Sequence, residues 1–221
     1  MKKENNTFNM GGGFTMLEMI VALGVFATVA VLSISSLLSL TGAKKKALTL
    51  QSVQDNLRFS IEAIARDLRQ GDFFYCSENL EDFPDAPAYG ELPPTQDCAG
   101  GQIITFLNRE NNVTTYRIGT TDSSSSCGEG HLCIEKAVRN TGTLTDKYSA
   151  VPNFSAITSQ DIEINQFDLY VTGSAKGDSS TPDLIEPRIT IVVDGIVKIG
   201  KEESEFHLQT SVSSHRNLSR D

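Results

Sequence analysis

The sequence predicts an α+β fold, in which one long N-terminal helix is followed by an antiparallel β-sheet domain. First, residues 14–40 are predominantly apolar and are long enough to cross a bilayer core, which takes a helix of about 20 residues. Second, apolar residues continue at helical spacing as far as Leu68. Third, short runs of β-branched and aromatic residues, separated by turn signals, fill the chain beyond residue 101. Strands that follow one another after a single helix are typical of an antiparallel sheet with helix on one face.

The apolar segment is the first predicted element. Between Met19 and Leu32 its one conventional polar residue is Thr28. A continuous helix there satisfies its own backbone hydrogen bonds, as the hydrocarbon of a membrane requires. Glu18 lies near the start of the segment, where a charge is expensive and indicates a function. Because lysines both precede the segment (residues 2–3) and follow it (residues 44–46), the positive-inside rule does not fix its orientation.

A secretory signal and a plain membrane anchor are the two other interpretations of this segment. A cleavable secretory signal has an apolar core of about 7–15 residues followed by a small-residue cleavage site. This segment is longer, and no such site is evident at its end. A plain membrane anchor fits the length but leaves Glu18 unexplained.

The helix is expected to continue beyond the apolar segment and to end near Gln70. Apolar residues recur at gaps of three and four, which places them on one stripe of a helix. Glu62 and Arg66 are expected to form an i,i+4 pair, and Gly71 is expected to cap the C-terminus. The alternative is two helices separated by a break near Gly42. The stripe consists of Leu50, Val53, Leu57, Ile61, Ile64 and Leu68.

The remaining chain is expected to be a β-rich head. Residues 73–101, which contain four prolines, are predicted to be loop, as are residues 173–183. The Asp194-Gly195 dipeptide lies between β-branched runs and predicts a hairpin turn. The predicted strands are residues 102–107, 113–118, 131–136, 162–164, 166–171, 188–193, 196–199 and 205–212.

The four cysteines all follow the apolar segment, and their even number in a domain that would be exported predicts two disulfides. Three pairings are possible, and proximity in the chain favours Cys76–Cys98 and Cys127–Cys133. Zinc is disfavoured because there is no C-x-x-C pair.

The composition argues against several functions. The chain has 221 residues and a net charge of −9, so it is poorly suited to holding nucleic-acid phosphates. It lacks the G-x-S-x-G, H-E-x-x-H and Walker motifs, so no enzyme activity and no cofactor are predicted. The acidic residues between Glu78 and Asp85 lack the spacing of a calcium loop. Three scattered histidines (His131, His207, His215) and three short glycosylation sequons (at Asn112, Asn153 and Asn217) carry no prediction.

The residues around the start of the apolar segment resemble a known signal. Gly13-Phe14-Thr15, followed by Glu18 and directly by the apolar run, is similar to the class III signal of type IV prepilins and type II secretion pseudopilins. The resemblance implies that a membrane-embedded prepilin peptidase cuts between Gly13 and Phe14 and methylates the new amine of Phe14. It also implies that Glu18 guides assembly by pairing with the N-terminus of a neighbouring subunit. A pair between Glu18 and Phe14 within one subunit is the competing interpretation.

Two further stretches narrow the resemblance. Residues 56–70, which end in ARDLRQ, resemble the second half of the long helix in PilW-type minor pilins and in the related J-type pseudopilins. The order of residues 187–191 and 206–213 resembles the end of PilW-type pilins. The resemblance implies a pilin-like fold and a structural, non-enzymatic minor subunit of a type IV pilus (fimbrium). Its partners would be other pilin or pseudopilin subunits, reached through the N-terminal helix. The prepilin would span the inner membrane once with its N-terminus in the cytoplasm, and the mature subunit would lie in a pilus at the cell surface.

The domain organisation expected from these observations has five parts. They are a prepilin leader (1–13), a transmembrane or filament-core helix (14–40), its amphipathic continuation (41–71), a β-rich head (72–214) and a polar tail (215–221). The alternatives are a J-type pseudopilin of a type II secretion system, a competence-pilus subunit, and a membrane-anchored surface enzyme.

Overall fold

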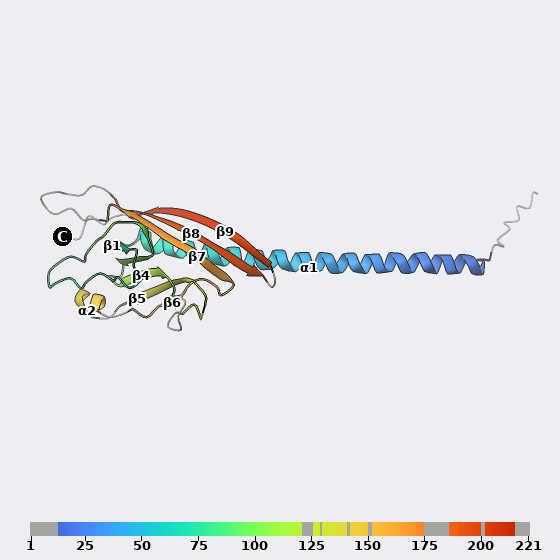
Figure 1. Cartoon of the computed structure of the whole chain (residues 1–221), viewed down its shortest axis with the longest axis horizontal. Coiled ribbons are helices and arrows are strands. Elements are labelled where there is room, and N and C mark those ends of the chain that lie inside the picture. Colours follow the sequence, from blue (N-terminus) through green and yellow to red (C-terminus); the bar gives the residue numbers. More distant parts are fainter. Residues whose placement is uncertain are drawn as a thin grey trace, which may run out of the picture. The chain divides into compact units, whose positions relative to one another are not determined.

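A computed structural model describes residues 13–120, 126–128, 130–140, 142–149, 152–174, 186–199 and 202–214 (Figure 1). Most of the expected leader, the whole tail and most of the 173–183 loop lie outside the described residues. The chain divides into two units, Met1–Leu48 and Thr49–Asp221, and each is described by itself.

The described residues of the first unit are 13–48, and all of them from Met16 onward belong to helix α1 (Met16–Arg69). The side chains of its apolar segment are exposed, and it is the one helix among the described residues that is long and apolar enough to be a candidate membrane span. The helix is uninterrupted at Gly42, so the break considered from the sequence is not formed.

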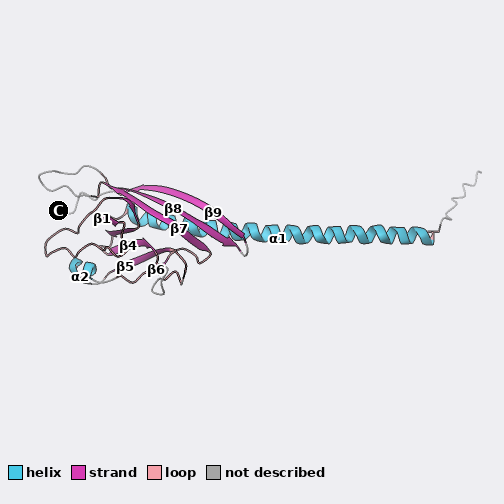
Figure 2. Ribbon diagram, viewed as in Figure 1, coloured by secondary structure: helices cyan, strands magenta, loops and turns pink. Residues whose placement is uncertain are grey.

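The second unit contains two antiparallel sheets (Figure 2). The first has the order β1-β3-β4-β5-β6 and is formed by β1 (Asp72–Ser77), β3 (Ile103–Leu107), β4 (Val113–Ile118), β5 (Ile134–Arg139) and β6 (Ser155–Ala156). The second has the order β2-β7-β8-β9 and is formed by β2 (Cys98–Gly101), β7 (Ile162–Thr172), β8 (Arg188–Ile199) and β9 (Glu202–Ser213). A short helix, α2 (Leu144–Ser149), lies between β5 and β6 in the chain. One apolar N-terminal helix and antiparallel sheets confirm the α+β class.

The core of the second unit lies between the C-terminal part of α1 and both sheets. The apolar stripe expected on the helix supplies Val53, Leu57, Ile64 and Leu68, all buried. Burying each such side chain contributes about 1.5–3 kcal/mol, so packing fixes this part of the helix against the sheets. The sheets complete the same cluster with Phe74, Ile104, Phe106, Tyr116, Ile134, Ile162, Ile164, Phe167, Leu169, Ile189, Ile191 and Val193, among others. Figure 1 shows β7, β8 and β9 beside this cyan part of α1.

The prediction of loop throughout residues 73–101 is wrong. Strands β1 and β2 lie in this stretch, and β1 pairs with β3. Strand β1 lacks an alternating pattern because residues on both of its faces are buried: Phe74 lies in the main core, and Phe73 packs with Leu107, Val113 and Tyr148 in a second cluster. The third strand is also displaced from its expected position, to Ile134–Arg139.

The hairpin turn predicted at Asp194-Gly195 is wrong as well. Strand β8 continues through both residues, and Gly195 pairs with Ile164 of β7 and Phe206 of β9. A Cβ at Gly195 would lie 2.4 Å from the Glu163 carbonyl oxygen and 2.6 Å from the Phe206 ring. Glycine is therefore present because neighbouring strands approach closely, as is common for glycine inside a strand.

Gly71 has a similar explanation. It follows α1, but it does not have the positive φ of a left-handed cap. A Cβ there would lie 2.5 Å from the Phe106 ring, so glycine allows the chain to leave the helix against the core. The carbonyl of Gly71 also accepts a hydrogen bond of 2.6 Å from the hydroxyl of Ser214, which lies directly after β9.

Candidate functional site

The residues singled out for processing lie immediately before and in the first turn of α1. Gly13 and Phe14 precede the helix, and the Phe14 side chain is 78% exposed. Glu18 is exposed in the first helical turn. A carboxylate in the first turn interacts favourably with the helix dipole, so Glu18 also has a local structural role.

Thr15 is a residue of this segment to which the sequence analysis gave no role. Its hydroxyl oxygen accepts a hydrogen bond of 3.2 Å from the backbone N–H of Glu18. This bond satisfies one of the free N–H groups at the start of a helix, as an N-cap residue does. The T-x-x-E spacing is the sequence signature of a capping box, and it could have predicted the start of the helix. Gly13, Phe14 and the cap residue Thr15 thus lie outside the helix and are exposed, and the helix begins directly after them.

Both cysteine pairs are disulfide-bonded, as proximity in the chain favours. Cys76 of β1 is joined to Cys98 of β2, and Cys127 is joined to Cys133, each with a Cα–Cα distance of 5.6 Å. The first bond links the two sheets. Gly101 lies against this bond, because a Cβ at that position would lie 2.4 Å from the sulfur of Cys76. The second bond closes a short loop before β5.

A buried carboxylate lies beside the second disulfide. Glu135 of β5 is 0% exposed, and its Oε2 accepts a hydrogen bond of 3.0 Å from the Nε of Arg117, its cross-strand neighbour on β4. Its other oxygen, Oε1, accepts hydrogen bonds of 2.8 Å from both the backbone N–H and the hydroxyl of Ser126. The guanidinium of Arg117 also lies 3.8 Å from the centre of the Phe154 ring. The charge of Glu135 is thus compensated within the fold, which indicates a structural group.

A second polar cluster connects α1 to the first sheet. Asp67 of α1 accepts hydrogen bonds from the hydroxyl of Tyr116 (2.7 Å) and from the ammonium of Lys136 (2.6 Å). Burial, and then the hydrogen bond to Asp67, raise the pKa of Tyr116 well above its ordinary value. Burial likewise raises the pKa of Tyr148 on α2. Both tyrosines therefore remain neutral hydrogen-bonding groups at physiological pH.

The residues considered for a metal site make other contacts in the structure where they are described. Within the described part of the chain, Cys127, Cys133 and Glu135 form the one cluster with metal-ligand spacing, but its two sulfurs are bonded to each other. In the acidic loop, Asp82 accepts hydrogen bonds from the hydroxyls of Ser77 and Tyr75. His207 contacts Asp194 at 2.9 Å on an exposed sheet face, His131 is exposed, and His215 lies outside the described residues.

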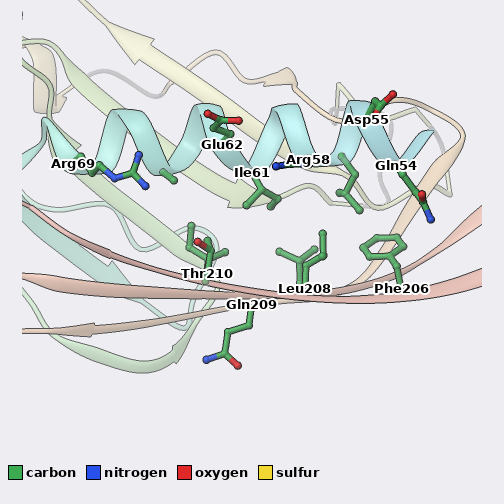
Figure 3. Close-up of a pocket in the computed structure, with 14 residues that line it drawn as sticks. Gln54, Asp55, Arg58, Ile61, Glu62, Arg69, Phe206, Leu208, Gln209 and Thr210 are labelled. Carbon is green, nitrogen blue, oxygen red and sulfur yellow. The ribbon is translucent and has the colours of Figure 1, made fainter. Parts of the chain in front are cut away.

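A groove lies between α1 and β9, entirely within the second unit. Its volume is about 640 Å³. Figure 3 shows Phe206, Leu208 and Thr210 of β9 pointing toward the helix, Ile61 pointing back toward β9, and Gln209 pointing away. Leu208 is 39% exposed although it lies on the inner face, because β9 is the edge strand of its sheet as described. Charged residues of the helix (Asp55, Arg58, Glu62 and Arg69) also line the groove.

Comparison of this chain with protein-family models, with curated proteins and with solved structures found no match.

Proposed function

We propose that this chain is a structural minor subunit of a bacterial type IV pilus, without enzyme activity. In this proposal prepilin peptidase cuts after Gly13 and methylates Phe14, and the mature subunit joins the filament or its tip through the apolar part of α1. Before assembly the chain would span the inner membrane once, with its N-terminus in the cytoplasm.

The observation that carries the proposal is the junction between an exposed Gly13-Phe14 bond and the helix that begins directly after Thr15, with Glu18 in its first turn. A peptidase needs accessible backbone outside a helix. Gly13 and Phe14 are exposed and non-helical, whereas helical backbone follows Thr15. After cleavage, the new amine of Phe14 and the carboxylate of Glu18 are opposite charges at the start of an apolar segment. Unpaired charges are expensive there, so pairing between neighbouring subunits would favour assembly in register.

The head domain supports the proposal in a second way. The apolar stripe of α1 is buried against two antiparallel sheets, so the helix that begins in the apolar segment is also the central element of the head. A pilin-like subunit requires this combination, since one end of its helix enters the filament and the other end supports the exported domain. Two disulfides are consistent with export to an oxidising compartment.

The test is the variant Glu18→Ala, expressed in the native host. The proposal predicts that wild type and variant are both trimmed to begin at Phe14, and that only wild type enters filaments sheared from the cells. Glu78→Ala, an exposed carboxylate of the head, is the matched control and should assemble normally. A variant that assembles as well as wild type, or a wild-type chain that is never trimmed, would refute the proposal.

A J-type pseudopilin of a type II secretion system is the alternative, because residues 56–70 resemble that group as well. The destination of the trimmed protein distinguishes the two. Recovery with surface pili favours the minor pilin, whereas recovery only with a secretion complex favours the pseudopilin. A competence-pilus subunit would require salt-dependent DNA binding by the purified protein, against the net charge of −9.

A further inference from the structure

The groove between α1 and β9 and the exposed side chain of Phe59 are features that the proposed function does not use. Phe59 is 72% exposed, although an aromatic ring of this size is normally an interior or interface residue. Ile61, which points into the groove, is two residues further along the same helix. Because each residue of a helix turns by about 100°, Phe59 and Ile61 point in nearly opposite directions. The helix therefore carries an apolar projection on one side and an apolar recess on the other.

A stripe of charges separates these two features. Asp55, Arg58, Glu62 and Arg66 are spaced by three, four and four residues, so they fall within about 80° of the helix surface. Their charges alternate in sign at each turn. The i,i+4 pair expected between Glu62 and Arg66 is not formed, and among the described residues none of the four makes an ion pair.

We infer that the groove receives Phe59 of a second copy of this chain, whose helix lies parallel to α1 and is displaced by one helical turn. The parallel orientation rests on the proposed function, because copies anchored in one membrane have their helices in the same direction. The displacement follows from the charges. Copies in register place like charges side by side, whereas a shift of about four residues, about 6 Å, places opposite charges together.

The direction of the shift is also determined. In the favourable shift, each residue of the second copy lies beside the residue numbered four lower in the first copy. Arg66 of the second copy then meets Glu62 of the first, and Glu62 of the second copy meets Arg58 of the first. Phe59 of the second copy then lies level with Asp55, at the end of the groove where Figure 3 places Phe206. The opposite shift would need Arg66 of the first copy to meet Glu62 of the second. Arg66 lies about 20° from Phe59 on the helix surface, on the side away from the groove, so it does not face a helix docked there.

The contact is heterologous, because the projection and the recess lie on different sides of the helix. A heterologous contact leaves each pair of copies with one free recess and one free projection. It therefore continues from copy to copy and produces a row of subunits in place of a closed dimer.

Cysteine cross-linking of the full-length protein in membranes tests this inference. All four native cysteines are in disulfides, so introduced cysteines report the contact. With both Phe59→Cys and Phe206→Cys in one chain, oxidation should give a ladder of dimers and higher species. Phe59→Cys alone, Phe206→Cys alone, and Phe59→Cys with Tyr170→Cys on the outer face of β7 should remain monomers.

Charge inversion provides the second arm. In the double-cysteine background Glu62→Arg replaces both attractive contacts by repulsive ones, and we expect the yield of cross-linked species to fall about tenfold. The triple change Arg58→Glu, Glu62→Arg and Arg66→Glu restores both contacts with inverted signs, so the yield should return to within about twofold of the parent.

Three results would overturn the inference. They are equal cross-linking by Phe59→Cys alone, which indicates a two-fold contact; cross-linking to a protein of another size; and a triple variant no better than Glu62→Arg. Mass analysis of the same sample shows independently whether the chain begins at Phe14. A trimmed chain that does not cross-link refutes only the groove contact, and an untrimmed chain that does cross-link refutes only the pilus function.

Discussion

Removing the guanidinium from the buried carboxylate of Glu135 should destabilise the head strongly. Arg117→Leu replaces the guanidinium, which lies over Phe154 and pairs with Glu135, by a shorter apolar side chain, and so removes the cationic partner of the 0% exposed carboxylate. Breaking a buried ion pair in this way typically costs about 3–5 kcal/mol. Because the two hydrogen bonds from Ser126 remain, we expect a value at the lower end, about 3 kcal/mol. For a domain of this size each kcal/mol lowers the melting temperature by about 2–4 °C, so the expected shift is about 6–12 °C.

The assay is thermal unfolding of the full chain in detergent, followed by near-ultraviolet circular dichroism of its tyrosines. Wild type, Arg117→Leu, Glu135→Leu and the double variant form a double-mutant cycle. The double variant should be more stable than Arg117→Leu because no uncompensated charge remains. Arg109→Leu, an exposed arginine of the same head, should change the stability by less than about 0.5 kcal/mol. The reasoning would be refuted if Arg117→Leu melted within about 2 °C of wild type, or if the double variant were the less stable of the two.

Three other predictions concern the head. Gly101→Ala should impair formation of the Cys76–Cys98 bond, because the added Cβ would lie 2.4 Å from the sulfur of Cys76. Thiol labelling of the unfolded protein measures the loss of the bond. The control Gly42→Ala, where nothing lies within 4 Å of the added Cβ, should leave the bond intact. The free energy of unfolding should fall as the pH rises above about 10, because Tyr116 and Tyr148 ionise in the unfolded chain while their raised pKa values keep them protonated in the fold. Tyr116→Phe should make the free energy of unfolding depend less steeply on pH in this range. An unchanged dependence would contradict the raised pKa of Tyr116. Replacing Cys127 and Cys133 together by serine should cost about 2 kcal/mol in thermal unfolding, the lower end for a short loop, whereas no loss would show that the bond adds nothing to stability.

The parts of the fold that could be predicted from sequence are those with a periodic signal. The α1 stripe repeats at helical spacing, and the β3–β4 hairpin contains β-branched residues on either side of a polar turn. Strand β1 gives no such signal, because its residues are buried on both faces by two separate clusters. At Asp194-Gly195, a local turn signal was outweighed by tertiary packing, since Gly195 accommodates the ring of Phe206 from the next strand.

The residues of the candidate site also differ in whether a local sequence pattern predicts them. Gly13, Phe14 and Glu18 belong to a contiguous motif, and the Thr15 cap follows from its spacing to Glu18. The Arg117–Glu135 pair and the groove depend on strand register and on the placement of β9 beside α1. Residues so far apart in the chain carry no local pattern that would bring them together, so only the folded structure identifies them.

The most direct measurement of the proposed function is the intact mass and N-terminal residue of the protein extracted from the membranes of its own host. Processing as a prepilin predicts a chain that begins at N-methylated Phe14 and lacks four hydrogens because of its two disulfides. A chain that retains Met1, or one that is cut after the apolar segment, would contradict the proposal.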